Sequence, residues 1–244
     1  MAKKDKTKAI EGKNKKSFQL DLFSNFLTND ESKVSNTIEL WESFPKYHFS
    51  KQRQNLLRKK DGTADPFDWP FNSEESEYMV RSNPAPIEVK PGEFKHFFPG
   101  EIEELVEEAL KKLLTKRSHG IHISERDETW ARFSWNELKT ELMKNCHDIK
   151  IPRLRLAIDI MSQSIITVYK DGDRIYRGPI LADLTLISRK DYLKDSSSKN
   201  IVRMPIFITR AINNIEYRQF NYELYMKLSM QLSRWWYKKL VNRA

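Results

Sequence analysis

Apolar residues in the middle of the chain recur at helical spacing. Over residues 100–115 they follow the spacing i, i+3, i+4 and i+7, which predicts a helix with one buried stripe. The stripe consists of Ile102, Leu105, Val106, Ala109, Leu110, Leu113 and Leu114. We expect the opposite face to be solvated, because runs of charge on amphipathic helices usually face water. That face carries Glu101, Glu103, Glu104, Glu107 and Glu108.

The next pattern predicts a strand, two helices and a hairpin. Residues 131–133 suit a short strand, and Ser134 with Glu137 has the spacing of a capping box at a helix start. Pro152 suits the first turn of a second helix over residues 151–164. The dipeptide Asp171-Gly172 predicts a tight turn between two strands within residues 165–176.

The C-terminal part of the chain predicts three further elements. Alternating residues favour a strand within ILADLTLI (residues 180–187) and another over residues 201–208. Residues 218–240 predict one long helix. Its apolar stripe would consist of Phe220, Leu224, Leu228, Leu232 and Trp235.

Helix, strand, helix, turn, helix and hairpin is the element order of a winged helix. In that fold the helix before the hairpin can lie in the DNA major groove while the hairpin touches the backbone. The candidate DNA-binding residues are therefore those at the start of that helix, Lys150, Arg153 and Arg155, and those on the hairpin, Lys170, Arg174 and Arg177. The alternative is that these are surface charges on a winged helix used for protein contacts.

The chain divides into three parts with different compositions. Residues 1–35 are lysine-rich with one apolar island, and we expect a disordered arm. Residues 36–98 mix aromatic residues with prolines, which predicts an extended wrap with little regular structure apart from a short helix near 51–60. Residues 99–244 are the predicted winged-helix domain. The expected fold class is therefore α+β, with a long N-terminal extension.

Charge and composition favour a partner that is a polyanion. The 244 residues carry a formal net charge of +9. Residues 1–60 hold 14 Lys and Arg against 7 Asp and Glu, and residues 151–244 hold 17 against 8. Basic blocks bind phosphates with release of counterions. No apolar run approaches the roughly 20 residues of a membrane span, and the single cysteine, Cys146, fits a reducing cytoplasm.

Candidates for catalysis or metal binding are weak. His119, His122, Glu125 and the pair Cys146-His147 match no established zinc spacing. Asp171-Gly172-Asp173 is better explained by a hairpin turn than by a metal site. The chain has no glycine-rich phosphate loop, and Cys146 lacks a catalytic setting. We therefore expect no enzyme activity, no cofactor and no metal.

The folded body resembles the winged-helix replication initiators of bacterial plasmids, the TrfA-like and related Rep proteins. The likeness lies in TWARFSWNELKTELMKN, IPRLRLAIDIMSQSIITVY and RQFNYELYMKLSMQLSRWWYKKL, and it spans about residues 99–240. The resemblance implies a protein without a catalytic site that binds repeated sequences (iterons) at a plasmid origin. Such a protein opens the duplex and recruits host replication proteins.

Many of these initiators carry two winged helices, of which the second usually makes the main sequence-specific contacts. This chain ends at residues 241–244, where a second unit would begin, so it is either a one-domain initiator or a fragment. In two-domain relatives the first winged helix largely serves dimerisation and backbone contact. Whether Arg153 and Arg155 contact bases therefore stays open.

Residues 19–23 read QLDLF and form the apolar island of the arm. They resemble the pentapeptide by which many bacterial proteins dock on the sliding clamp, and TrfA-like initiators are similar in carrying such a motif ahead of their winged helices. The resemblance implies that Gln19 is the polar anchor and that Leu22 and Phe23 fill the apolar pocket of the clamp, with Leu20 and Asp21 between them. The alternative is that Leu20, Leu22, Phe23 and Phe26 pack on the body as a short amphipathic helix.

The sequence thus favours a plasmid replication initiator of the bacterial cytoplasm, associated with plasmid or nucleoid. Its expected partners are double-stranded origin DNA and the sliding clamp, with the replicative helicase and the host initiator as further candidates. We expect a monomer–dimer equilibrium and no membrane contact. The alternatives are a winged-helix transcription regulator and a clamp-tethered DNA-processing enzyme.

Overall fold

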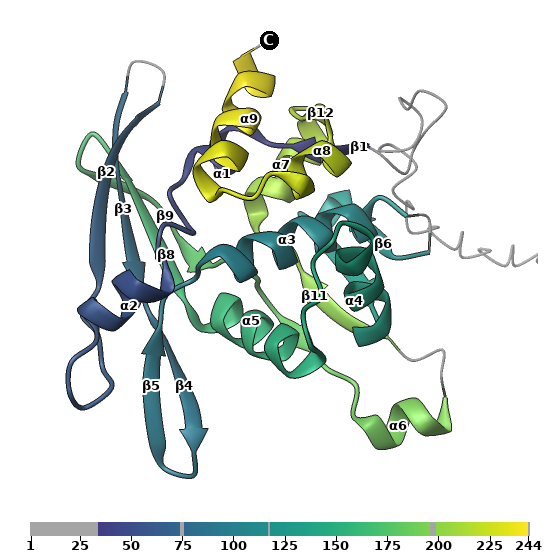
Figure 1. Cartoon of the computed structure of the whole chain (residues 1–244). Coiled ribbons are helices and arrows are strands. Elements are labelled where there is room, and N and C mark those ends of the chain that lie inside the picture. The colour runs from purple at the N-terminus through teal and green to yellow at the C-terminus, as the bar shows by residue number, and fades with distance from the viewer. Residues whose placement is uncertain (1–33, 74–75, 117, 196–198, 244) are drawn as a thin grey trace, which may run out of the picture.

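Helix α3 (Glu101–Leu114) runs through the centre of the molecule, and the other elements surround it (Figure 1). The computed structural model describes residues 34–73, 76–116, 118–195 and 199–243. The strands are β1 (Val34–Thr37), β2 (Phe67–Ser73), β3 (Ser76–Asn83), β4 (Ala85–Lys90), β5 (Glu93–Phe97), β6 (Gly120–Ile123), β7 (Glu128–Phe133), β8 (Ile165–Lys170), β9 (Asp173–Pro179), β10 (Leu184–Thr185), β11 (Asn200–Arg203) and β12 (Arg218–Asn221). The other helices are α1 (Glu39–Ser43), α2 (Lys51–Leu57), the 3-10 helix η2 (Ser124–Arg126), α4 (Trp135–Lys144), α5 (Ile151–Gln163), α6 (Arg189–Lys194), α7 (Ile206–Asn214), α8 (Tyr222–Lys227) and α9 (Gln231–Arg243).

The strands form antiparallel sheets on different sides of α3. One four-stranded sheet has the order β2-β3-β8-β9 and the other has the order β10-β11-β7-β6, while β1 pairs with β12 and β4 with β5. Helices α1, α7, α8 and α9 lie above α3 in Figure 1, and α4 and α5 lie below it. Helices and antiparallel sheets combined in this way confirm the predicted α+β class.

The core lies between the apolar face of α3 and the elements that pack on it. Leu110, Leu113, Phe133, Leu138 and Leu154 are all fully buried, and α3 contacts β7, α4 and α5. Each such side chain stabilises the fold by about 1.5–3 kcal/mol relative to an exposed position.

Local signals in the sequence place several elements correctly. The predicted helix over residues 100–115 is α3, and the predicted second helix is α5 with Pro152 in its first turn. Asp171 and Gly172 both adopt positive φ, +50° and +90°, as a tight hairpin turn between β8 and β9 requires. The short helix expected near 51–60 is α2, capped by the Ser50 side chain.

The predicted long helix over residues 218–240 is wrong. Residues 218–221 form β12, which pairs with β1, and the Asn221 side chain then caps α8. Leu228 is extended and ends α8, and α9 begins three residues later at Gln231. The proposed stripe is therefore not one face, because Phe220 is buried whereas Leu224 and Leu232 are exposed.

Two predicted strands are shorter than expected. Within residues 180–187 only Leu184–Thr185 lies in a strand. The strand predicted over 201–208 stops at Arg203, and Pro205 precedes α7. Proline has no N–H to continue a ladder, and its fixed φ suits a helix start, so the apolar run after it folds as a helix.

The expectation of little regular structure over residues 36–98 is also wrong, because β2, β3, β4 and β5 all lie there. Pro70 lies in β2, which is an edge strand of its sheet, and Pro86 lies in β4 of a two-stranded sheet. An edge strand tolerates proline, since one side of it needs no ladder hydrogen bonds. The prolines therefore mark strand edges here rather than an irregular wrap.

The hairpin β8–β9 pairs with β3, whereas the strand before α4, β7, pairs with β6 and β11. The hairpin thus extends the sheet built from the segment that precedes α3. Among the described residues, the helices are all too short or too polar to cross a lipid bilayer.

The start of α4 is fixed by a capping box, as predicted. The Glu137 backbone N–H donates to Ser134 Oγ (3.2 Å), and the Ser134 N–H donates to Glu137 Oε2 (2.8 Å). Lys199 Nζ (2.6 Å) and His119 Nε2 (3.1 Å) also contact the Glu137 carboxylate. Burial by itself would raise the pKa of Glu137, but these contacts outweigh it and lower the pKa to about 2.

This lowered pKa predicts that the protein loses stability as the pH falls. The folded pKa of Glu137 lies below its ordinary value of 4.5, so its stabilisation is present above that value and is lost as pH falls toward about 2. In Glu137→Gln, where the amide retains the capping hydrogen bond, the free energy of unfolding should depend less on pH between about 5 and 2. Urea titrations across this range measure it. The exposed Glu125→Gln should keep the wild-type pH dependence, and identical curves for Glu137→Gln and the wild type contradict the assignment.

Candidate nucleic-acid interface and the buried charge cluster

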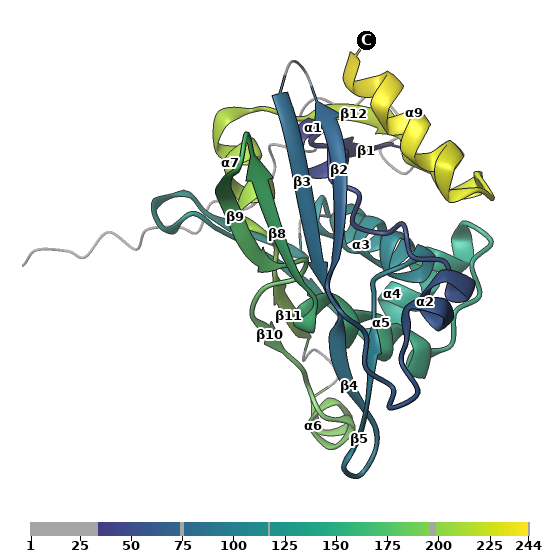
Figure 2. The ribbon, with the colours of Figure 1, turned by 90° about the vertical axis from the view of Figure 1, so that its left-hand side faces the viewer.

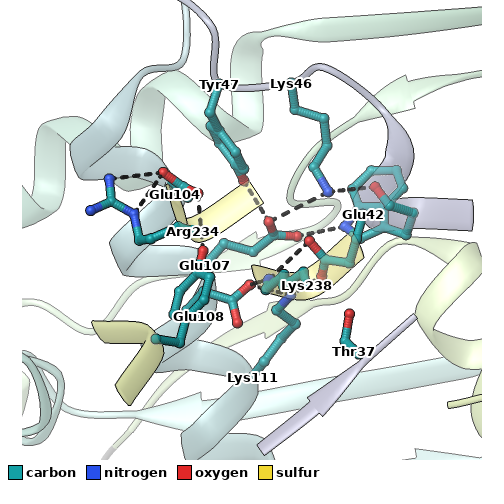
Figure 3. A network of polar contacts seen from close by, with 12 residues as sticks. Thr37, Glu42, Lys46, Tyr47, Glu104, Glu107, Glu108, Lys111, Arg234 and Lys238 are labelled. Carbon is teal, nitrogen blue, oxygen red and sulfur yellow. Dashed lines mark hydrogen bonds and ion pairs between the residues drawn. The ribbon is translucent and has the colours of Figure 1, made fainter. Parts of the chain in front are cut away.

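The glutamates of α3 do not form the solvated face that the sequence pattern predicts. Glu103, Glu107 and Glu108 are at most 1% exposed, and only Glu101 lies at the surface. Figure 3 shows the carboxylates of Glu104, Glu107 and Glu108 turned toward cations from two other segments. We call this group the buried charge cluster; it consists of Glu42, Glu104, Glu107, Glu108, Lys46, Lys111, Arg234 and Lys238.

Glu107 binds the segment that follows α1. Its Oε1 accepts a hydrogen bond from Trp41 Nε1 (2.6 Å), and its Oε2 accepts one from the Tyr47 hydroxyl (2.7 Å). The Lys46 ammonium lies 3.6 Å from Glu107 Oε2 and 4.0 Å from the centre of the Trp41 ring. A charge, a cation–π contact and two hydrogen bonds therefore hold residues 41–47 on α3.

Two lysines bridge two carboxylates in the middle of the cluster. Lys111 and Lys238 each contact both Glu42 and Glu108, and the Lys238–Glu42 distance is 2.9 Å. α1, α3 and α9 each contribute to this group, so it joins segments that are far apart in the chain. Each of these four ions has two counterions, which offsets the loss of hydration.

Arg234 closes the other end of the cluster. Its Nε and Nη2 donate to Glu104 Oε2 (3.2 and 3.1 Å), and its Nη1 donates to the Leu228 carbonyl (2.7 Å). Nη2 also reaches Glu101 at 2.9 Å, and the Tyr225 hydroxyl donates to Glu104 (2.9 Å). The Leu228 bond caps the end of α8 and helps to set the break between α8 and α9.

Burial and ion pairing shift the pKa values of the cluster carboxylates in opposite directions. Burial opposes ionisation of Glu42, but Lys111 and Lys238 outweigh it and hold the Glu42 pKa well below its usual range. Burial likewise opposes ionisation of Glu107, and Lys46 overcomes it and lowers the Glu107 pKa. For Glu104, burial prevails over Arg234 and raises the pKa. The centre of the cluster is thus the part most firmly held as ion pairs.

The cluster encloses little free space. A cavity of about 30 Å³ beside it is lined in part by Lys46, Tyr47, Glu104 and Lys238. Such a volume holds about two water molecules and no larger ligand. Each of the four carboxylates contacts at least one cation of the cluster.

The cluster predicts that replacing Lys238 of α9 destabilises the protein much more than replacing its neighbour Lys239. Lys238→Met leaves Glu42 and Glu108 buried with one shared cation, so the free energy of unfolding should fall by about 3–5 kcal/mol. Urea denaturation measures the loss. Lys239→Met is the control: Lys239 lies over the Trp235 ring (4.7 Å), a contact worth about 0.5–1 kcal/mol. Adding Glu108→Gln to Lys238→Met should recover part of the loss; equal losses in the two lysine variants contradict the role of the cluster.

The candidate DNA surface is the outer face of the sheet β2-β3-β8-β9. Opposed residues of antiparallel strands share a face, and this register places Arg81, Thr167 and Arg177 in one row. Two residues along, on the same face, Met79, Tyr169 and Arg174 form another row. Figure 2 shows this sheet facing the viewer with no described helix in front of it. We call it the outer sheet face.

The arginines of the outer sheet face differ in their pairing. Arg81 makes two 2.7 Å hydrogen bonds to Asp68 on β2, which lower the Asp68 pKa and neutralise the guanidinium charge. Arg174 and Arg177 are exposed and have no ion pair within the described residues. Lys170, the remaining hairpin candidate, is half-buried over the Tyr78 ring (5.7 Å). Within the described ranges, the cations of this face without an acidic partner are therefore Arg174 and Arg177, while Glu77, two residues from Met79 on β3, adds an exposed carboxylate to the same face.

The three candidate residues at the start of α5 differ in the contacts that they make. Lys150 is exposed at the N-cap. Arg153, expected to reach outward, instead binds the buried Glu103 carboxylate at 2.8 Å. Arg155 is exposed and lies 5.1 Å from the Trp135 ring. Only Lys150 and Arg155 of this group remain available to a ligand.

The structure does not bring the two groups of candidates into one surface. In both Figure 1 and Figure 2 the free end of the hairpin β8–β9 points toward the top of the view, whereas α5 lies in the lower half. A DNA duplex contacting the hairpin end does not automatically contact the start of α5. Sequence spacing placed these residues in one motif and carried no signal of this separation.

The other sequence candidates have structural partners. His119 contacts Ser118 and Glu137, and His122 contacts Thr129 and Asn213. Across the described ranges, no three His, Cys, Asp or Glu side chains converge as metal ligands would. The QLDLF residues lie outside the described residues.

No protein-family model, no curated protein and no solved structure matches the chain.

Proposed function

We propose that this protein is a plasmid-type replication initiator that acts by binding alone, holding origin DNA with its folded body and the bacterial sliding clamp with QLDLF. The observation that carries the DNA-binding part is the uncovered outer sheet face, on which Arg174 and Arg177 have no anionic partner among the described residues. Recruitment of the helicase or the host initiator, a monomer–dimer equilibrium and a cytoplasmic location belong to the same proposal.

Charge and shape both support duplex binding by this face. Unpaired arginines on a protruding hairpin can reach the phosphate backbone, and release of counterions supplies the affinity. Tyr169, opposite Arg174 in the register, is half-buried and offers a neutral contact, whereas Thr167 is buried. The element order α3, β7, α4, α5, β8, β9 supports treating the hairpin as the wing of a winged helix. Lys150 and Arg155 then form a second, separate contact.

The clamp-binding part of the proposal is supported by the sequence. QLDLF offers an amide, a carboxylate and three apolar side chains in five residues, within a lysine-rich arm. A short segment gains affinity by placing a few apolar anchors in a preformed groove. Gln19, Leu22 and Phe23 are the proposed anchors.

The hairpin arginines should dominate DNA binding. Arg174→Ala with Arg177→Ala should weaken binding to origin DNA, and the slope of log affinity against log salt should shrink by about one for each phosphate that is no longer neutralised. The fold should persist, because both side chains are exposed. Titrations at several salt concentrations measure both quantities. If the arginines contact bases, discrimination against random DNA should also fall by about 1–3 kcal/mol per bidentate contact.

Lys150→Ala with Arg155→Ala is the matched comparison, since it removes the same number of exposed cations from α5. If the salt slope changes only in this variant, the DNA-binding surface is at α5 and not at the hairpin. If the slope changes in neither variant, neither surface binds duplex DNA. Footprinting on DNA flanking the gene separates the functions: protected short direct repeats support the initiator, and one promoter operator supports a transcription regulator.

The clamp motif yields an independent prediction. Leu22→Ala with Phe23→Ala should abolish binding to a bacterial sliding clamp and leave DNA affinity unchanged, because each side chain is a proposed buried anchor worth about 2 kcal/mol or more. Surface plasmon resonance with immobilised clamp measures it. Phe18→Ala, one residue outside the motif, should retain binding. Unaltered binding by the double variant would overturn the assignment of the motif.

A further inference from the structure

Helix α9 buries charged side chains and exposes large apolar ones, whereas an ordinary surface helix does the reverse. Arg234, Lys238 and Asn242, four residues apart, face the interior and are 0%, 4% and 7% exposed. Leu232, Trp236 and Leu240, also four residues apart, face outward and are 58%, 49% and 62% exposed. Residues at this spacing share one side of a helix. The side of α9 with Arg234 and Lys238 is therefore buried, with Tyr237 and Val241 also packed against the core, while Leu232, Trp236 and Leu240 lie outside. We call Leu232, Trp236 and Leu240 the α9 stripe.

The buried charge cluster explains the orientation of α9 but leaves the α9 stripe uncovered. Among the described residues the stripe has no apolar cover, and Met230, just before the helix, is exposed as well. The Lys239 ammonium lies over the rings of Trp235 and Trp236 (4.7 and 6.0 Å), so the stripe is bordered by positive charge. Contiguous exposed apolar surface of this kind typically marks a binding site.

The chain contains a segment with the complementary chemistry. Residues 17–32, SFQLDLFSNFLTNDES, contain three acidic residues and no lysine or arginine, although the 16 residues before them are lysine-rich. The acidic residues are Asp21, Asp30 and Glu31. The apolar residues are Phe18, Leu20, Leu22, Phe23, Phe26 and Leu27. An apolar, acidic segment matches an apolar stripe bordered by a cation.

The first strand of the described chain leads to α9, which brings the segment before it toward that helix. β1 starts at Val34, and at its other end the Thr37 hydroxyl accepts a 3.4 Å hydrogen bond from Asn242 near the end of α9. The eight residues from Phe26 to Val34 can span up to about 27 Å. The α9 stripe is only about 12 Å long, at 1.5 Å per residue. Tethering at this distance also gives the segment a high effective concentration, in the millimolar range for short flexible linkers.

We propose that residues 18–27 of the same chain dock on the α9 stripe, with their apolar side chains against Leu232, Trp236 and Leu240. Docking itself does not depend on the clamp. Its consequence rests on the proposed function: Leu22 and Phe23 cannot occupy the stripe and the clamp pocket together, so docking withholds the clamp motif. If nine chains in ten are docked, the apparent clamp affinity is about tenfold weaker than that of the free motif.

Photo-crosslinking tests the docking without the clamp. Phe26→p-benzoylphenylalanine, in a one-to-one mixture of unlabelled and 15N-labelled full chain, is irradiated and the products are mapped by mass spectrometry. Crosslinks to residues 230–241 within single chains are expected, and they should disappear in Trp236→Ser with Leu240→Ser. The control, Leu56→Ser with Leu193→Ser, alters residues that are 86% and 74% exposed on other helices and should keep the crosslinks.

Each other outcome of the crosslinking overturns the proposal. Crosslinks between labelled and unlabelled chains make a second copy the occupant of the stripe. Crosslinks elsewhere, or none, show that this segment does not cover α9. Crosslinks that persist in Trp236→Ser with Leu240→Ser show contact that does not depend on the stripe.

Clamp binding tests the consequence separately. The full chain should bind the clamp about tenfold more weakly than a synthetic peptide of residues 15–30, and Trp236→Ser with Leu240→Ser should close most of that gap. Equal affinities of full chain and peptide overturn the competition. If neither binds the clamp, the proposed function fails while the crosslinks still decide the docking.

Discussion

The carboxylates of α3 need cations that their own helix does not fully supply. Glu107 and Glu108 are buried at the centre of the molecule, and their partners come from about 60 residues earlier and 130 residues later in the chain. Removing one member leaves an uncompensated buried charge, which costs several kcal/mol, so α1, α3 and α9 cannot be buried independently. The arrangement of the upper half of the molecule follows from this constraint.

Because of this constraint, part of each basic block of the sequence lies in the interior and not on the surface. Lys46, Arg234 and Lys238 contribute to the two basic blocks of the sequence, yet all three are interior residues. The acidic residues of α3 that join the cluster are interior as well, so the cluster holds four carboxylates and four cations that contribute little field at the surface. The charges that a polyanion can meet are a smaller set, of which Arg174 and Arg177 are the clearest because a hairpin presents them without an acidic partner among the described residues.

Elements whose signals are local could be predicted from the sequence, and elements decided by distant partners could not. The Ser134–Glu137 box and the Asp171-Gly172 turn each fix their element within a few residues. A helical pattern, however, shows only that one face of α3 is apolar; whether the other face meets water depends on Lys46 and Lys238. The candidate site divides in the same way, since the exposure of Arg174 follows from its hairpin, whereas the diversion of Arg153 to Glu103 needs a contact 50 residues away.

Two opposing free-energy terms decide the orientation of α9. Turning the helix to bury Leu232, Trp236 and Leu240 would gain about 1.5–3 kcal/mol for each side chain. The turn would also remove Arg234 from Glu104 and Lys238 from Glu42 and Glu108, which keep only Lys111. Breaking a buried ion pair by removing one partner costs about 3–5 kcal/mol. Leu232, Trp236 and Leu240 are already about half buried, so the turn would recover only part of their burial term, and the loss of the ion pairs outweighs it. The remaining hydrophobic free energy of the stripe is then available to a ligand, for which residues 18–27 are the occupant that we propose.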